Sequence, residues 1–186
     1  MTKKRKNAAF IAACLFPSLI LLLIFVIYPT VSIFNVSLFK WGGYSATRTF
    51  VGLENYRILL TDQRFFNSLK NSLLLIIVVS SITLVLSLFC AEVLSRERLR
   101  GKTFFRIVLY IPNILSTVVI AAVFSAIYDP KSGLLNSLTK ESILWLGDRS
   151  LVIYSVAIAM IWQAVGYYMI MYMSSMAQVP KSLYDP

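Results

Sequence analysis

Four long stretches without a charged side chain divide the chain. They run over residues 7–39, 71–91, 107–128 and 150–180, which are 33, 21, 22 and 31 residues long. A helix that rises about 1.5 Å per residue needs roughly 20 residues to cross the hydrocarbon core of a bilayer. The pattern therefore predicts four transmembrane helices, near residues 10–34, 71–93, 105–128 and 151–176.

The composition supports lipid as the solvent. Hydrophobic residues make up 58% of the chain and charged residues 14%, whereas soluble domains average about 45–50% and 25%. These values exclude a disordered chain and disfavour an ordinary soluble domain. The fold class expected is an all-α integral membrane protein, a polytopic helical bundle.

Several kinds of chemistry are missing from the sequence. The chain has no histidine, which removes the commonest general base and a common metal ligand. It also lacks a Gly-x-x-x-x-Gly-Lys-Ser/Thr nucleotide loop and any Ser/His/Asp or Cys/His set. We therefore expect no catalytic residue, no metal site and no cofactor bound by this chain, which is not predicted to be an enzyme.

Basic residues indicate the orientation. The net charge is +10, and its densest clusters lie at residues 3–6 and in the short segment between the second and third spans. By the positive-inside rule both are cytoplasmic, although the predicted outer loops also hold eight Lys and Arg residues. The prediction is a multi-pass protein of the cell membrane that does not bind nucleic acid. Residues 1–9, 94–104 and 177–186 are then cytoplasmic, and residues 35–70 and 129–150 are external.

The N-terminus admits a second interpretation as a signal peptide. A basic start precedes apolar residues, and the segment ending at Cys14 resembles a lipoprotein cleavage box. Only six apolar residues precede Cys14, however, and a cleaved segment needs about 7–15. We favour an uncleaved first span, with Cys14 and Cys90 as apolar packing residues in separate helices.

The two external loops contain local signals. Residues 52–60 predict a short amphipathic helix, and Thr61 and Asp62 can cap the helix that follows. A second short helix is expected from Leu134, after a turn around Pro130. Tyr128 and Trp145 are expected at the level of the lipid headgroups. From spacing alone a folded cap on the membrane is favoured over a docking surface.

The last two spans carry polar side chains. Pro112 predicts a kink in the third span, and Asn113, Ser116 and Thr117 either bond the freed carbonyls or face a polar cavity. In the fourth span an aromatic and amide-bearing segment contains Trp162, Gln163 and Tyr167. It either packs helices together, with the amide bonded across the interface, or lines a pathway for a solute such as a sugar. The pattern alone favours packing in both spans.

Apart from Glu92 and Arg106 at the ends of two spans, the four predicted spans contain no Asp, Glu, Lys, Arg or His. Proton-coupled carriers usually need such groups at membrane depth. If the chain moves a solute against a gradient, another subunit is expected to supply the energy.

Short motifs in order along the chain resemble a known family, the permease subunits of binding-protein-dependent ABC importers of the carbohydrate-uptake class. The resemblance includes maltose, multiple-sugar and glycerol-phosphate permeases and runs from about Phe16 to the end. The motifs are Tyr28-Pro29, Phe50-Val51-Gly52-Leu53-Glu54-Asn55-Tyr56, Phe66-Asn67-Ser68-Leu69-Lys70-Asn71-Ser72, Arg100-Gly101-Lys102-Thr103-Phe104-Phe105-Arg106, Tyr110-Ile111-Pro112, Asp129-Pro130-x-x-Gly133-Leu134-Leu135-Asn136, Trp145-Leu146-Gly147-Asp148 and Val179-Pro180-x-x-Leu183-Tyr184.

The resemblance implies a type I importer fold (MetI-like) in a bacterial or archaeal cell membrane. Its implied partners are a second permease subunit, two subunits that bind ATP and Mg²⁺, and an external solute-binding protein. Implied pathway residues are Trp162, Gln163, Tyr167, Asn113, Ser116 and Thr117. Implied docking residues are Glu54, Asn55, Tyr56, Asp129, Gly133 and Asn136.

The end of the chain departs from the family pattern. The family's Ala-rich coupling loop should follow Leu183 and Tyr184, but the sequence reads Asp185-Pro186 and stops. Pro180, Leu183, Tyr184 and Asp185 are therefore expected to form only part of the ATPase contact, and the chain is expected to be C-terminally truncated. The alternative is a stand-alone four-helix membrane scaffold or receptor without transport activity.

Overall fold

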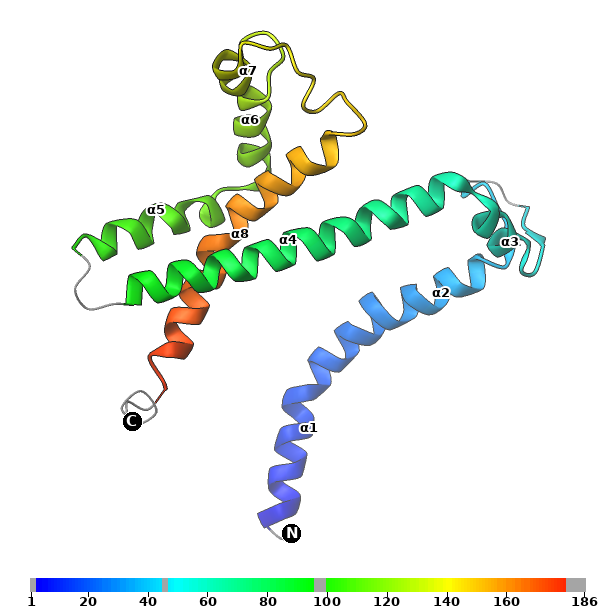
Figure 1. The fold of residues 1–186 in the computed structure, drawn as a ribbon. Coiled ribbons are helices and arrows are strands. Elements are labelled where there is room, and N and C mark those ends of the chain that lie inside the picture. Colours follow the sequence, from blue (N-terminus) through cyan, green and yellow to red (C-terminus); the bar gives the residue numbers. More distant parts are fainter. Residues whose placement is uncertain (1–2, 45–46, 96–99, 180–186) are drawn as a thin grey trace. The chain divides into compact units, whose positions relative to one another are not determined.

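The computed structural model describes residues 3–44, 47–95 and 100–179. The chain divides into two compact units, Met1–Asn67 and Ser68–Pro186. Each unit is considered by itself, because their relative position is not determined (Figure 1). Both consist mainly of helices, which confirms the helical membrane fold class expected from the sequence.

The first unit begins with one long helical stretch. It comprises α1 (Lys3–Leu22), a π-helical turn η1 (Leu23–Ile27) and α2 (Tyr28–Val36). The segment Phe10–Val36 is long and apolar enough to cross a membrane. Its large hydrophobic side chains, such as Phe16 and Phe25, are exposed. A helix that is apolar all round needs another apolar surface or lipid around it.

A small hairpin and a helix complete the first unit. Strand β1 (Phe39–Lys40) pairs antiparallel with β2 (Thr49–Phe50), and α3 (Glu54–Thr61) follows. Asp62 Oδ1 accepts a hydrogen bond of 2.8 Å from the backbone N–H of Arg64. This caps the next helix, as the sequence predicts. The hairpin was not predicted, because two-residue strands show no alternating pattern.

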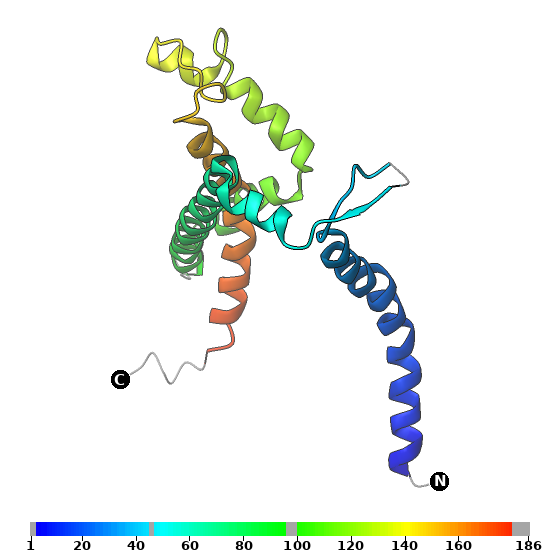
Figure 2. The ribbon, with the colours of Figure 1, turned by 90° about the vertical axis from the view of Figure 1, so that its right-hand side faces the viewer.

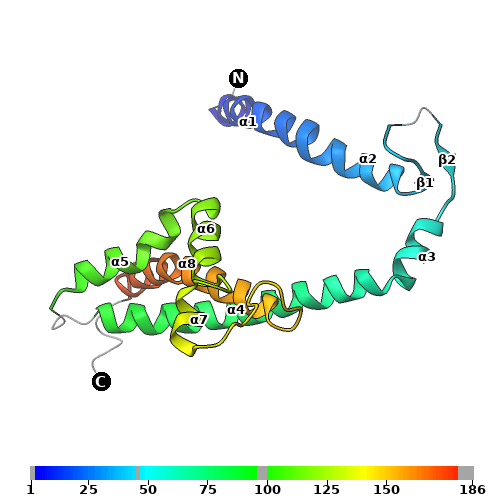
Figure 3. The ribbon, with the colours of Figure 1, turned by 90° about the horizontal axis from the view of Figure 1, so that it is seen from above.

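The second unit is built around a crossing of helices. Helix α4 (Gln63–Ser95) begins at the end of the first unit, and α5 (Lys102–Ile114), α6 (Thr117–Ile127), α7 (Leu134–Thr139) and α8 (Val152–Met176) follow. Helix α8 lies between α4 and α5 (Figure 3). A small core of Ala91, Leu94 and Met169 joins α4 to α8, and Ser87 Oγ donates a 2.9 Å hydrogen bond to the carbonyl of Val165.

Gly166 sets the distance between α8 and α5. A Cβ atom at this position would lie 2.6 Å from the carbonyl carbon of Leu109 and 2.8 Å from Cα of Tyr110. These contacts are with backbone atoms, which cannot rotate away as a side chain can. Helices in membranes approach closely where small residues face one another, and here the absence of a side chain brings the two backbones together.

The third predicted span is not one kinked helix. Helices α5 and α6 are bent by 102° at the break between them (Figures 1 and 2). The break lies at Leu115 and Ser116, which are both extended, whereas Pro112 remains inside α5. The predicted kink at Pro112 is therefore wrong in position. Ser116 explains the restart, because its Oγ accepts a hydrogen bond from the N–H of Val119 and caps α6.

We predict that Gly166→Val loosens the α5–α8 contact. Overpacking a well-packed site costs typically about 1–3 kcal/mol, and here the added atoms meet backbone. Thermal unfolding of the purified protein in detergent should show a lower Tm. The matched control is Gly42→Val, because a Cβ at Gly42 meets nothing within 4 Å. Equal Tm values for the two variants would contradict the proposed packing.

Candidate functional site

The polar and aromatic segment of α8 leaves surface free. The side chains of Trp162 and Tyr167 are 42% and 44% exposed. The Trp162 ring lies edge-on to Phe124 of α6 with centroids 5.5 Å apart, and Tyr167 packs against Tyr168 at 5.4 Å. Gln163 is half-buried, and its side-chain amide has no hydrogen-bond partner in the described part of the chain. An amide flanked by aromatic rings is thus available to bind another group.

The same segment contacts both helices of the broken span. Trp162 reaches α6 through Phe124, and one turn later Gly166 meets α5 at Leu109. Within the described residues, no hydrogen bond joins Asn113, Ser116 or Thr117 to this segment of α8. Ser116 caps α6, Thr117 is exposed and Asn113 is half-buried. The structure therefore places α8 against both α5 and α6, but it does not show a shared cavity lined by all the predicted pathway residues.

Asn136 organises the loop between α6 and α8. The side chain is 6% exposed, and its Nδ2 donates to the carbonyl of Ile143 at 2.9 Å and that of Pro130 at 3.2 Å. Its Oδ1 accepts from Trp145 Nε1 at 2.8 Å. Asn136 is an expected docking residue, and in this structure its amide is buried and hydrogen-bonded inside the loop.

Tyr128 and Trp145 also lie inside this loop. Tyr128 is 3% exposed, and its hydroxyl donates a 3.0 Å hydrogen bond to the carbonyl of Ser155. Ser155 Oγ in turn donates to the carbonyl of Trp145 at 3.0 Å. The polar tips of both aromatic residues therefore have protein partners, unlike the headgroup contacts that the sequence suggested. Ser155 was missed, since one serine in an apolar helix gives no distinctive signal.

Asp129 and Gly133 form the turn that precedes α7. Asp129 Oδ1 accepts hydrogen bonds from Ser132 N at 2.7 Å, Ser132 Oγ at 2.9 Å and Lys131 N at 2.9 Å. These donors, those of Ser132 first, hold the pKa of the Asp129 carboxyl below its ordinary value. A Cβ at Gly133 would lie 2.6 Å from the carbonyl oxygen of Ile127. The geometry gives both residues a structural role.

The docking residues predicted in the first unit differ in how far they are engaged within the loop. Asn55 Nδ2 donates to the carbonyls of Ser37 at 2.8 Å and Phe39 at 3.0 Å, which holds α3 against the hairpin. The hydroxyls of Tyr56 and Ser37 are 2.6 Å apart. Glu54 is exposed and lies 3.8 Å from Arg57. Of these three residues, Glu54 has the most accessible polar group.

The predicted ATPase contact lies outside the described residues. It comprises Pro180, Leu183, Tyr184 and Asp185.

Comparison with known proteins gives a consistent result. No family model matches the chain. It is 37% identical over 178 residues to "Probable ABC transporter permease protein YurN" of Bacillus subtilis, covering 92% of this chain and 61% of that protein. It is 27% identical over 194 residues to "Diacetylchitobiose uptake system permease protein NgcF" of Streptomyces coelicolor, covering 96% and 55%. The chain thus spans about three-fifths of the curated relatives that it matches.

Solved structures of similar fold come from a bacterial transporter for the acidic polysaccharide alginate. The TM-score is 0.79 at 19% sequence identity, and the match covers 98% of this chain and 62% of the other. A second structure of an alginate transporter, in complex with a periplasmic protein that holds an alginate pentasaccharide, matches with the same TM-score and 20% identity. At these identities the structures establish a shared fold.

We predict that Asn136→Asp destabilises the α6–α8 loop. A carboxylate retains the acceptor for Trp145 but loses the donor to the two carbonyls, and it buries a charge against them. An unsatisfied buried polar group costs about 1–3 kcal/mol. Hydrogen exchange of the backbone amides at residues 143–145 should become faster. Asn67→Asp, on the exposed surface of α4, is the control and should leave that exchange unchanged.

The turn at Asp129 should have a defined pH dependence. Because the pKa is lower in the folded protein, the stability contributed by this carboxylate is fully present above its ordinary pKa of 3.8. It is lost as the pH falls through the lower folded pKa. Carboxyl NMR should therefore show Asp129 titrating below 3.8, and Ser132→Ala should move the midpoint upward. Alanine keeps the backbone N–H of residue 132, so an unchanged midpoint in that variant would exclude the Ser132 hydroxyl as a cause of the lowered pKa.

Proposed function

We propose that this chain, which is similar in sequence to permease proteins of ABC transporters, is a membrane-spanning permease subunit of an ATP-driven importer. The importer would translocate a sugar or related solute delivered by an external binding protein. The observation that carries the proposal is the homology over nearly the whole chain, supported by a fold with a TM-score of 0.79 to an importer. Its membrane-spanning character rests on the three long apolar helices and the one bent pair found in the described part of the chain.

The solute would pass along the polar and aromatic segment of α8. Trp162 and Tyr167 offer exposed ring faces, which suit the C–H faces of a sugar ring. The free amide of Gln163 can both donate to and accept from sugar hydroxyls. A diacetylchitobiose permease among the relatives and an alginate transporter among the structures support a carbohydrate. Asn113 and Thr117, at the bent span, are secondary candidates for the same pathway.

The orientation proposed follows the basic clusters. Residues 1–9 and 94–104 would face the cytoplasm of a bacterial or archaeal cell. The β1–β2 hairpin, α3 and the α6–α8 loop would then face outward. The binding protein would then dock on exposed groups such as Glu54, while Asn55 and Asn136 hold the loops in shape. An alginate transporter of similar fold forms a complex with a periplasmic protein that holds an alginate pentasaccharide.

The energy would come from other subunits. We expect a second permease subunit and two ATPase subunits that bind ATP and Mg²⁺, with Pro180, Leu183, Tyr184 and Asp185 near the ATPase contact. Affinity purification of the chain from its native membrane after cross-linking tests this assembly. Recovery of an ATP-binding protein and a second permease is expected. Recovery of the chain with neither would favour the stand-alone scaffold.

We predict that Trp162→Ala or Tyr167→Ala reduces solute uptake without lowering the amount of protein in the membrane. Loss of one ring face or hydroxyl contact should weaken transport about tenfold, which corresponds to about 1.4 kcal/mol. Uptake of a labelled solute by cells that carry each variant is the measurement, with immunoblotting for abundance.

The control for this experiment is Met171→Ala, which removes an equally exposed side chain from the same helix. It should retain normal uptake. Normal uptake in both Trp162→Ala and Tyr167→Ala would remove α8 from the pathway.

A further inference from the structure

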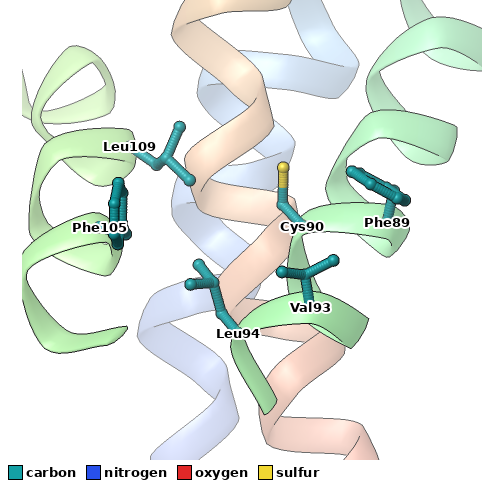
Figure 4. A pocket seen from close by; sticks show the side chains of 6 residues that line it. All are labelled: Phe89, Cys90, Val93, Leu94, Phe105 and Leu109. Atoms are coloured by element: carbon teal, nitrogen blue, oxygen red, sulfur yellow. The ribbon is translucent and has the colours of Figure 1, made fainter. Parts of the chain in front are cut away.

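An apolar groove lies between α4 and α5. Its volume is about 270 Å³, and it is lined by Phe89, Cys90, Val93, Leu94, Phe105 and Leu109. Figure 4 shows the side chains of both helices around this space, with the ribbon of α8 passing behind it. The volume lies near the lower end of the roughly 300–1,000 Å³ of ligand clefts. No polar surface lines the groove, so a sugar is a poor ligand for it.

One end of the groove is cationic. Arg106 follows the lining residue Phe105, and its Nη2 donates a 3.0 Å hydrogen bond to the carbonyl of the lining residue Leu94. The guanidinium therefore lies where α4 ends. Lys102 precedes Arg106 by one turn of α5 and shares its helical face.

The described residues next to this end are net basic. Arg100, Lys102 and Arg106 stand against Glu92. Among the described residues, Arg106 makes one hydrogen bond, from its Nη2 to the carbonyl of Leu94, and its buried Nε has no partner there. A guanidinium has five N–H donors in a fork that matches phosphate. The bond to Leu94 uses one N–H group of Nη2. The N–H groups of Nη1 are left to donate to an anion.

We propose that this groove binds an anionic phospholipid, with an acyl chain along the apolar walls and the phosphate at Arg106 and Lys102. The apolar body and the cationic end match the two parts of such a lipid. Basic pockets between membrane helices are a recurring place for anionic headgroups. A zwitterionic lipid offers the same chains but no net charge, so the site should select by headgroup. This lipid site does not depend on the solute that the permease carries.

Native mass spectrometry of the purified protein, in micelles with equal phosphatidylglycerol and phosphatidylcholine, tests the proposal. The wild type should retain phosphatidylglycerol in preference to phosphatidylcholine. Arg106→Gln should reduce this preference about fivefold, the effect of one basic residue near a membrane surface. Leu109→Trp, which fills the groove and keeps the charge, should reduce retention of the lipid itself.

Matched controls separate the site from general effects. Arg149→Gln removes one basic charge from the α6–α8 loop, and Ile158→Trp adds the same bulk to an exposed position of α8. Both should retain the preference of the wild type. The proposal would be overturned if Arg106→Gln kept the same lipid preference as Arg149→Gln. It would also be overturned if Leu109→Trp retained as much lipid as Ile158→Trp.

Two further outcomes decide the remaining cases. Arg106 also contacts the end of α4, so if Arg106→Gln does not fold, Lys102→Gln takes its place and must lower the preference. A helix of a second copy or of another subunit could cover the groove instead. Complete loss of bound phosphatidylglycerol from the assembled complex would show such an occupant and overturn the lipid site.

Discussion

The close approach of backbones at Gly166 is the constraint on which the second unit depends. It places α8 directly against α5 at Leu109, while Ser87 bonds the carbonyl of the preceding residue, Val165, and so ties α8 to α4. Hydrophobic attraction cannot hold helices together in lipid, because lipid chains are as apolar as the helices. Close packing and a few hydrogen bonds between helices must do so. The crossing therefore fixes where Trp162, Gln163 and Tyr167 lie relative to the bent span.

The loop between α6 and α8 solves a different problem. It has only one short helix, α7, so its backbone groups need side-chain partners. Asn136 supplies several of them, and Asp129 fixes the preceding turn. In the first unit Asn55 acts in the same way between α3 and the hairpin. Residues that belong to motifs of the importer family thus shape the loops, which leaves the exposed side chains around them for contact with a partner.

The second unit separates polar from apolar surface. The segment of α8 around Gln163 combines an unbonded amide with aromatic rings, whereas the α4–α5 groove is wholly apolar with a basic end. A solute and a lipid could therefore use different faces of the same helices. This separation follows from α8 lying between α4 and α5 (Figure 3).

The apolar helices, the membrane class and the resemblance to importer permeases can all be predicted from the amino-acid sequence. Long charge-free stretches need no tertiary information, because each must be long enough to cross the bilayer. The cap at Asp62 and the short helices α3 and α7 were also predictable, since their signals are local. Only the tertiary structure decided that α5 and α6 are separate helices, that Asn136 and Tyr128 are buried, and that Gly166 lies at a backbone contact. The burial of Tyr128 and the contact at Gly166 depend on residues far apart in the chain. At Ser116 and Asn136 the local pattern leaves open which group the side chain bonds, and only the structure shows the partner.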